Sequence, residues 1–442
     1  MSQETYPLLS ITHVLGFTKK GSDMKHLSTR IITVLALLLA LCLPAGAFAV
    51  ASAPSAGTVD ALAGQIAAYE SAQLAALSGG PTYGNEWALM ALARAGKLPD
   101  TLKQQYLNNL ALYLKAHGGS LGSTVTDYDR VILALTAMGV DATSFNGIDL
   151  TAPLADLTAI NSQGVSGTIY ALLALDSHAY PIPTLAAGSS GTQTTRPALV
   201  QAVVAAQLSG GGWNWGFGTA ADPDLTSMAL CALAPYYHGG DSAVDAAVDD
   251  GLAQLSAIQD DATAGFAADW APAPGSESSA QALVALSSLG IGVDDARFVK
   301  AGGSLYDSLA GFAIDAGSGA QAFVDYAGDT TPSGMATEQG LYALVALSRS
   351  LTGANRLYDM TDVTLAPFVL KSDDGGGGTP KTPGTPQKPA LDKPAAESAA
   401  ATGSNPLPQV GDGTVIATLS LAAAALAAGS LLVATGRRSW SR

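Results

Sequence analysis

The chain has little cysteine and little positive charge. Its 442 residues include 2 cysteines, 5 histidines and 21 lysines and arginines, against 36 aspartates and glutamates, so the formal net charge is −15. Cys42 lies in an amino-terminal apolar run, and Cys231 is the one cysteine of the remaining chain, so we expect no internal disulfide. Because nucleic acids are bound largely through Lys and Arg contacts to phosphate, this acidic chain predicts no nucleic-acid partner.

What the chain does contain is a recurring unit, and residues 210–237 (GGGWNWGFGTAADPDLTSMALCALAPYY) are its clearest copy. The leading glycines can adopt positive φ, so the chain can turn sharply and bring Trp213 and Trp215 inward over the next helix. Asp224 and Thr226 precede a run of small apolar residues, where a carboxylate and a hydroxyl can bond the free amides of a first helical turn. The unit predicts an aromatic turn followed by a helix that is buried on most sides.

Apolar cores of the same kind recur along the chain. Aligned on a final leucine, they end at Leu92, Leu135, Leu175, Leu233, Leu286 and Leu347. More polar helical patterns alternate with them, over residues 59–77, 102–116, 150–160, 197–208, 243–258 and 294–312. Because a single repeat cannot bury its apolar face alone, this alternation predicts a closed ring of helical hairpins. The apolar helices would form the inner wall and the amphipathic helices the outer wall.

The motifs in residues 210–237 and 277–290 (ESSAQALVALSSLG) resemble the repeats of prenyltransferases and squalene cyclases. The resemblance covers residues 58–365 and implies an α/α toroid, an architecture also used by transcobalamin-type carriers and complement-type thioester domains. We therefore predict an all-α protein in which residues 50–371 form an α/α toroid of about six helical hairpins. One fold hosts unrelated functions, so the resemblance implies the architecture more strongly than the chemistry.

Residues 1–49 indicate an amino-terminal extension and a secretory signal peptide. Basic residues between Lys25 and Arg30 precede an apolar run over residues 31–43, and Ala47-Phe48-Ala49 forms a small-x-small cleavage site. An apolar run of this length is too short to span a bilayer. We therefore predict that the protein is exported.

The carboxy-terminal residues indicate attachment to the cell surface. Residues 372–406 are rich in Gly, Pro, Thr and Ala, which predicts a disordered linker. Within residues 407–442, the motif Leu407-Pro408-Gln409-Val410-Gly411 precedes an apolar run and a basic tail, which predicts a transmembrane helix. This arrangement resembles a sorting signal of the LPXTG type, which implies a sortase as partner, with Val410 standing where the family has Thr. If a sortase does not cleave the motif, the helix still holds the protein in the membrane.

Acidic residues recur at the starts of the predicted inner helices. Asp224, Glu277 and Glu338 each lie nine positions before the aligned leucine, whereas Glu86 and Asp129 lie six positions before it. Because the inner helices of such a ring begin at the same end, we expect these side chains to surround one mouth. Either they cap the helices and complement the helix dipoles, or they form a negatively charged rim that attracts cations or hydroxyl-rich ligands.

The stretch Asp222-Pro223-Asp224-Leu225-Thr226 resembles the D-x-D-D-T motif of squalene-hopene cyclases, whose middle aspartate protonates an alkene. The resemblance implies that Asp224 is this acid, although Leu225 replaces the next aspartate of the motif. The zinc site of prenyltransferases needs an Asp, a Cys and a His that converge. Cys231 lies in the middle of a helix, where a buried apolar thiol is the ordinary structure. We predict no metal site and no cofactor.

Aromatic residues gather in the loops that enter two successive inner helices: Trp213, Trp215, Phe217, Phe266 and Trp270. Either these side chains fill a core or they stack on a ligand at the mouth. Stacking faces beside acidic hydrogen-bond acceptors suit a glycan or a flat ligand such as a corrinoid.

These patterns together predict an extracellular binding or adhesion module held at the cell surface, with the five aromatic residues and Glu338 as ligand-binding candidates. The alternative is a terpene-cyclase-like or glycan-active enzyme that uses Asp224 with Glu277, and Asp222 is a further catalytic candidate. Two carboxylates from adjacent helices can flank a glycosidic bond. A third interpretation is a structural spacer whose central channel is closed by side chains.

Overall fold

Helices dominate the described part of the chain. The computed structural model describes residues 53–268 and 270–371, and within them twelve α-helices stand beside four short strands. The prediction of a helix-rich, all-α class is confirmed. Within these residues no helix is both long enough and apolar enough to cross a membrane. The predicted signal peptide, the linker, the sorting signal and its transmembrane helix all lie outside the described residues.

Six helices carry the predicted apolar cores. They are α3 (Glu86–Arg94), α5 (Val125–Ala137), α7 (Gly164–Asp176), α9 (Pro223–Leu233), α11 (Ser276–Ser288) and α13 (Gly334–Thr352). Each of them packs against the next in this order, and α13 packs against α3, so the six contacts close a cycle. Every residue of α9 and α11 is buried, which fits their small side chains and their lack of a single apolar stripe. We call these six the inner helices.

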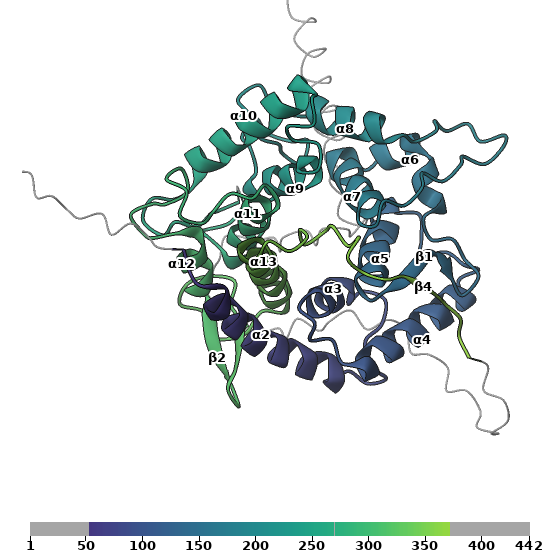
Figure 1. Ribbon diagram of the computed structural model, residues 1–442, viewed down its shortest axis with the longest axis horizontal. Helices are drawn as coiled ribbons and strands as arrows, with labels where there is room; N and C mark the ends of the chain where they lie inside the picture. Colours follow the sequence, from purple (N-terminus) through teal and green to yellow (C-terminus); the bar gives the residue numbers. More distant parts are fainter. Residues whose placement is uncertain (1–52, 269, 372–442) are drawn as a thin grey trace, which may run out of the picture. The chain divides into compact units, whose positions relative to one another are not determined.

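The remaining helices lie outside this cycle, as Figure 1 shows. They are α2 (Ala56–Ala76), α4 (Asp100–Ala116), α6 (Leu157–Asn161), α8 (Arg196–Ala205), α10 (Ser242–Ile258) and α12 (Leu305–Ala310). Contacts join α8 to α7, α10 to α9 and α12 to α11. The amphipathic segments predicted around residues 59–77, 102–116, 197–208 and 243–258 therefore form helices that cover the inner set.

The segment over residues 294–312 differs from the expected long helix, since only α12 forms there. Lys300 and Gly303 pair in an isolated β-bridge, and Gly302 packs so closely that a Cβ atom would come within 2.4 Å of the Ala262 carbonyl oxygen. The helix begins only after Ser304, whose hydroxyl forms a capping box with Asp307. Residues 152–161 differ similarly, as a 3-10 turn (Ala152–Ala155) followed by the short helix α6.

Four strands appear that the sequence did not predict. Strands β2 (Ala313–Gly317) and β3 (Ala320–Phe323) form an antiparallel hairpin, and β1 (Val140–Phe145) pairs in parallel with β4 (Ala366–Phe368). The second pair joins residues that lie far apart in the sequence. Between α13 and β4 the chain crosses the middle of the cycle of inner helices (Figure 1). We call residues 353–371 the crossing segment.

Arg94, at the end of α3, holds the crossing segment in place. Its side chain is 7% exposed and donates hydrogen bonds to Asp362 Oδ1 at 2.8 Å and to the carbonyl oxygens of Arg356 and Asp359 at 2.9 Å. Met360 is fully buried, and its amide donates to the Ser177 carbonyl oxygen at 2.7 Å. Burial of a methionine of this kind contributes about 1.5–3 kcal/mol.

We predict that Arg94→Met lowers the free energy of unfolding by about 3 kcal/mol, because two partly buried carbonyl oxygens lose their donor and Asp362 loses an ion-pair partner. Denaturant unfolding followed by circular dichroism measures this change. The control is Arg297→Met, which removes a half-exposed surface ion pair with Asp295 and should change stability by less than about 1 kcal/mol. An Arg94→Met midpoint equal to that of the wild type would contradict this function of Arg94.

Candidate functional site

The inner helices begin at one common end. Near their first turns, Arg130 of α5 donates to Glu86 of α3 at 2.8 Å, and Gln281 of α11 donates to Gln339 of α13 at 3.1 Å. Near the last turns, the Ser288 hydroxyl of α11 lies 3.8 Å from the Cys231 sulfur of α9. We call the end where these helices begin the amino-terminal mouth, and the opposite end the carboxy-terminal mouth.

A set of hydrogen bonds, which we call the clasp, ties the aromatic turn to the start of α9. The Trp213 amide donates to the Thr226 hydroxyl at 3.0 Å, and this hydroxyl donates back to the Trp213 carbonyl at 3.2 Å. The amide of Asp222, the N-cap residue, also donates to the Trp213 carbonyl, at 2.8 Å. Gly212 has the predicted positive φ of +72°, and a Cβ atom there would lie 3.0 Å from the Thr226 hydroxyl.

The clasp recurs before α11 and before α13. At α13, the Phe323 amide donates to the Thr337 hydroxyl at 3.1 Å, and the amide of the N-cap residue Ser333 donates to the Phe323 carbonyl at 2.9 Å. At α11, the amide of the N-cap residue Gly275 donates to the Phe266 carbonyl at 2.9 Å. All three aromatic residues at the head of a clasp are fully buried. The chain therefore contains three copies of one turn-to-helix unit, and the copy before α11 keeps only the hydrogen bond from the N-cap amide.

This repeat sets the register of the acidic residues. Thr226 and Thr337 occupy equivalent places in their clasps, so the equivalent of Asp224 in the third copy is Met335, two residues before Thr337. Glu338 therefore lies about one helical turn further into the ring than Asp224 and Glu277. The alignment on Leu347 had placed all three acids at the same level.

Two of the five predicted aromatic ligands belong to the core. Trp213 and Phe266 are fully buried, and the Trp213 indole N–H donates to the Val203 carbonyl of α8 at 2.7 Å. A Cβ atom on Gly251 of α10 would come within 2.8 Å of the Trp213 ring. Trp213 therefore packs the turn before α9 against the outer helices α8 and α10. It fills the core, which is one of the two alternatives given for it above.

The other three aromatic residues remain at the surface or close to it. Trp215 and Trp270 are partly buried, and their ring centroids lie 6.4 Å apart with the planes inclined by 56°. Within the described residues, neither indole N–H has a hydrogen-bond partner, although both nitrogen atoms are shielded from solvent. Phe217 is 53% exposed. This aromatic pair lies on the loops that enter α9 and α11 at the amino-terminal mouth.

The three catalytic candidates differ in their surroundings, and Asp222 and Asp224 differ most clearly. The Asp222 carboxylate caps α9 by accepting from the Leu225 amide at 2.9 Å, so the cap of this helix is Asp222 and not one of the five acids expected to surround the mouth. Asp224 is 8% exposed, and its Oδ1 atom has no hydrogen-bond partner among the described residues. Burial raises the pKa of Asp224 to about 6, although a side-chain hydrogen bond from Ser278 acts in the opposite direction.

Glu277 is the more strongly perturbed acid. It is 6% exposed, and burial raises its pKa to about 9, with further contributions from a hydrogen bond to Asp325 and from the Asp325 charge. The carboxylate also accepts from the Ser276 hydroxyl at 3.2 Å. The Glu277 carboxylate and the Tyr326 ring both lie within 3.5 Å of a Cβ atom built on Gly275. A pKa of about 9 favours the protonated form of Glu277 at neutral pH, the form that can donate to Asp325.

The remaining acids of the predicted rim differ in their hydrogen-bond partners. Glu86 accepts from Arg130, from the Tyr106 hydroxyl at 2.7 Å and from the Gly84 amide at 3.0 Å. Both carboxylate oxygens of Asp129 are buried without a partner among the described residues, and burial raises the pKa of Asp129 well above its ordinary value. Burial also raises the pKa of Glu338 to about 8, with a contribution from the charge of Glu70.

A small cavity of about 70 Å³ lies inside the amino-terminal mouth. Side chains of Glu338, Arg130 and Trp87 line it together with Tyr170 and Tyr342. The Trp87 ring lies 5.8 Å from the Tyr170 ring and 6.2 Å from the Tyr342 ring. Aromatic side chains from three inner helices therefore narrow the channel below the mouth.

Several residues at this mouth were not among the sequence candidates. Glu70 of α2 is 7% exposed with a pKa raised by burial to about 7, and it continues the buried stripe of Ile66 and Leu74 at helical spacing. The helical spacing of Ile66, Glu70 and Leu74 could have identified Glu70 from the sequence. Asp325 and Tyr326 follow the hairpin of β2 and β3, and no local pattern connects them to α11.

The described residues contain no group of three or more His, Cys, Asp or Glu side chains placed to hold a metal ion. No known protein family and no curated protein matches the chain. The function of the chain is therefore inferred from the geometry of its two mouths.

We predict that Glu277→Gln stabilises the protein increasingly as the pH rises from about 5 to 8. The folded-state pKa of Glu277, about 9, lies above its ordinary value of 4.5. The native state therefore binds more protons than the unfolded state across this window, and the wild type loses stability as the pH rises, by at most about 1.4 kcal/mol per pH unit for one group. Glutamine does not titrate.

Thermal melts at several pH values provide the test, and the quantity of interest is the Tm of Glu277→Gln minus that of the wild type. The control is Gln201→Ala, which removes an exposed side chain that does not titrate, so its Tm difference from the wild type should not vary with pH. A flat difference for Glu277→Gln would show that Glu277 titrates normally in the folded protein.

Proposed function

We propose that residues 50–371 form an α/α toroid built from prenyltransferase and squalene-cyclase-type repeats, displayed outside the cell and held there by the carboxy-terminal sorting signal or its membrane helix. The closed cycle of inner helices and the three copies of the clasp support the repeat architecture. The export and anchoring signals are features of the sequence in residues 1–49 and 372–442. A protein of this design works as a binding or adhesion module.

The proposed ligand of the amino-terminal mouth is a hydroxyl-rich molecule, a glycan. The observation that carries this proposal is a set of shielded polar atoms that have no hydrogen-bond partner among residues 53–268 and 270–371, namely Asp224 Oδ1 and the indole N–H groups of Trp215 and Trp270. Leaving such a group unpaired costs about 1–3 kcal/mol, and native structures seldom do so without a reason. A sugar hydroxyl can donate to the carboxylate and accept from an indole, while the aromatic faces stack on the sugar ring.

The dimensions of this mouth favour a glycan over a corrinoid. The cavity below the mouth has a volume of about 70 Å³, whereas sites that enclose a drug-sized ligand have about 300 Å³ or more. A glycan can rest on the rim with one sugar stacked on Trp215 or Phe217, and it does not need an enclosed volume. The same comparison disfavours a terpene cyclase, which must enclose a long apolar substrate.

One observation favours a glycan-active enzyme as the second candidate function. The pKa values of Asp224 and Glu277 are raised to about 6 and about 9, so at pH 7 one acid is ionised and the other is protonated. Two carboxyl groups whose surroundings separate their pKa values can serve as base or nucleophile and as general acid. In this reading Glu277 protonates the leaving oxygen and Asp224 acts as the nucleophile or the base.

We predict that the full chain binds chitotetraose, a neutral oligosaccharide probe, and that Trp215→Ala weakens the binding at least about tenfold, because stacking and one hydrogen bond are lost. Isothermal titration calorimetry measures both affinities. The matched control is Tyr237→Ala, which removes a partly buried aromatic side chain after the end of α9 and should leave the affinity unchanged. Equal affinities of the wild type and of Trp215→Ala for chitotetraose would contradict the stacking proposal.

The same samples distinguish a binding module from an enzyme. If the probe is hydrolysed, Asp224→Asn and Glu277→Gln should abolish turnover while changing the binding affinity by less than about tenfold, since each substitution keeps the shape of its side chain. Binding without any hydrolysis at pH 5 to 8 supports the adhesion or binding module.

Anchoring gives a separate prediction. Val410→Thr restores the LPXTG pattern, so the fraction of the protein linked to the cell wall should rise at the expense of the membrane fraction, if sortase cleavage limits attachment. Cell fractionation with immunoblotting measures the two fractions. The control is Val415→Thr, outside the motif, and an unchanged distribution for Val410→Thr would count against this account of the sorting signal.

A further inference from the structure

A second and larger cavity lies at the carboxy-terminal mouth, and it shares no lining residue with the cavity inside the amino-terminal mouth. Its volume is about 250 Å³. Leu173 of α7 and Ala232 of α9 contribute apolar lining, and the crossing segment contributes Arg356, Tyr358 and Thr361. Because Arg356 is exposed, the cavity is reachable from solvent.

Arginines gather at this mouth of an otherwise acidic protein. Arg94, Arg196, Arg349 and Arg356 lie here, where the inner helices end and their carbonyl groups carry partial negative charge. Arg196 donates to the carbonyl oxygens of Leu175 and Tyr180, at 2.9 and 2.7 Å. Basic side chains at helix carboxy-termini are expected from the dipoles alone, so their gathering does not by itself indicate a ligand.

One of these four arginines, Arg356, forms no ion pair with the residues that the structure describes. Arg196 pairs with Asp176 at 2.7 Å, and Arg94 and Arg349 share Asp362. Across residues 53–268 and 270–371, the Arg356 side chain makes no ion pair and no hydrogen bond, although its carbonyl oxygen accepts from Arg94. The Asp359 carboxylate, which also lines the cavity, already accepts from Asn355 and Thr361. The free guanidinium thus lies beside an apolar wall.

Hydroxyl groups complete the lining of this cavity. The Tyr358 hydroxyl makes no hydrogen bond with any residue that the structure describes, whereas the Tyr236 hydroxyl donates to Asp176 Oδ2 at 2.6 Å. Ser288 and Thr361 add two further hydroxyl groups. A guanidinium is the preferred partner of a carboxylate, which it binds through two parallel hydrogen bonds, and the hydroxyls suit a polyhydroxylated carbon skeleton.

We infer that the carboxy-terminal mouth binds a small hydroxylated carboxylate, a hexuronic acid, with the carboxylate on Arg356 and the sugar hydroxyls on Tyr358 and its neighbours. The volume, just below the range for drug-sized ligands, fits a monosaccharide. This site is separate from the proposed glycan site, because it uses other residues at the opposite end of the inner helices.

The test uses the full chain, glucuronate as the probe and glucose as its neutral counterpart. We expect glucuronate to bind measurably in isothermal titration calorimetry and glucose to bind at least about tenfold more weakly, since the charged hydrogen bonds are absent. Arg356→Gln should weaken glucuronate binding at least about tenfold, and Tyr358→Phe by a few fold. Thermal melts of both variants without ligand verify that they fold.

Two controls locate the site. Arg297→Gln removes a half-exposed arginine from the outer surface and should leave glucuronate binding unchanged. Trp215→Ala should also leave it unchanged, which separates this inference from the proposed glycan site. Equal binding of glucose and glucuronate, unchanged binding by folded Arg356→Gln, or no binding of glucuronate at all would each overturn the inference.

Discussion

The alignment of the inner helices is the constraint on which the rest of the structure depends. Helices that begin at the same end place their partial positive charges at one mouth and their partial negative charges at the other. The side chains follow this division, since Glu86, Asp224 and Glu277 lie in the first turns of their helices, whereas Arg94 and Arg349 lie in the last turns of theirs. The net charge of the chain says nothing of this division, because both mouths belong to one acidic protein.

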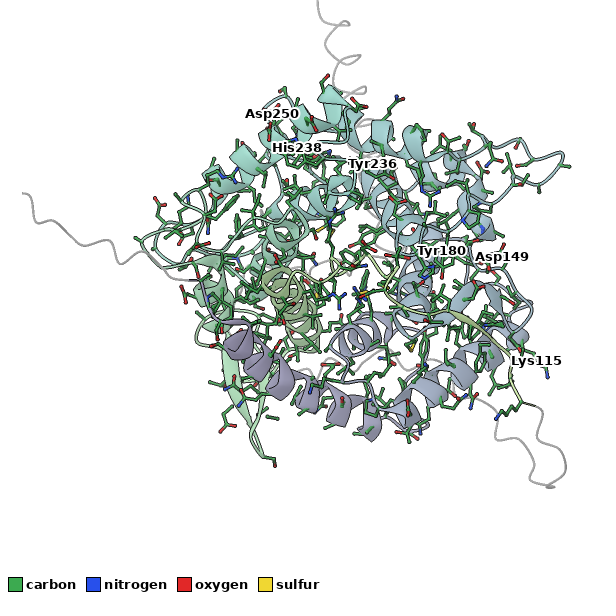
Figure 2. All side chains as sticks on the ribbon, in the orientation of Figure 1. Lys115, Asp149, Tyr180, Tyr236, His238 and Asp250 are labelled. Atoms are coloured by element: carbon green, nitrogen blue, oxygen red, sulfur yellow. The ribbon has the colours of Figure 1, made fainter. Side chains whose placement is uncertain are left out.

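The two mouths are also closed differently. Aromatic side chains of the inner helices narrow the amino-terminal mouth from within, as the contacts of Trp87 with Tyr170 and Tyr342 show. The carboxy-terminal mouth is covered by the crossing segment, which buries Leu357 and Met360 and is fixed by Arg94. Figure 2 shows Lys115, Asp149 and Asp250 at the outer edge of the ring.

The sequence predicted the helices well because each rests on a local pattern. The leucine-ended cores all became inner helices, and Gly212 adopts the positive φ that its turn requires. The pairing of β1 with β4 was not predictable, since it depends on contact between segments far apart in the chain. The sequence left open whether Trp213 fills the core or stacks on a ligand, because its indole N–H bonds to a carbonyl group of α8 and no feature of the turn itself reveals that partner.

The candidate site shows the same limit. Asp224 and Glu277 were identifiable from their position before an apolar helix, but the separation of their pKa values was not, because it depends on the burial of each carboxyl group and, for Glu277, also on Asp325 from a distant loop. Helix dipoles favour ionised acids at helix amino-termini, yet burial opposes that charge at both residues. A carboxyl group that stays protonated at a helix amino-terminus does not gain from the helix dipole and does not cap the helix. The N-cap residue of α11 is Gly275, which supplies no side-chain cap, so the raised pKa of Glu277 is better explained by a hydrogen bond to Asp325 in the free protein and to a ligand hydroxyl in the proposed complex.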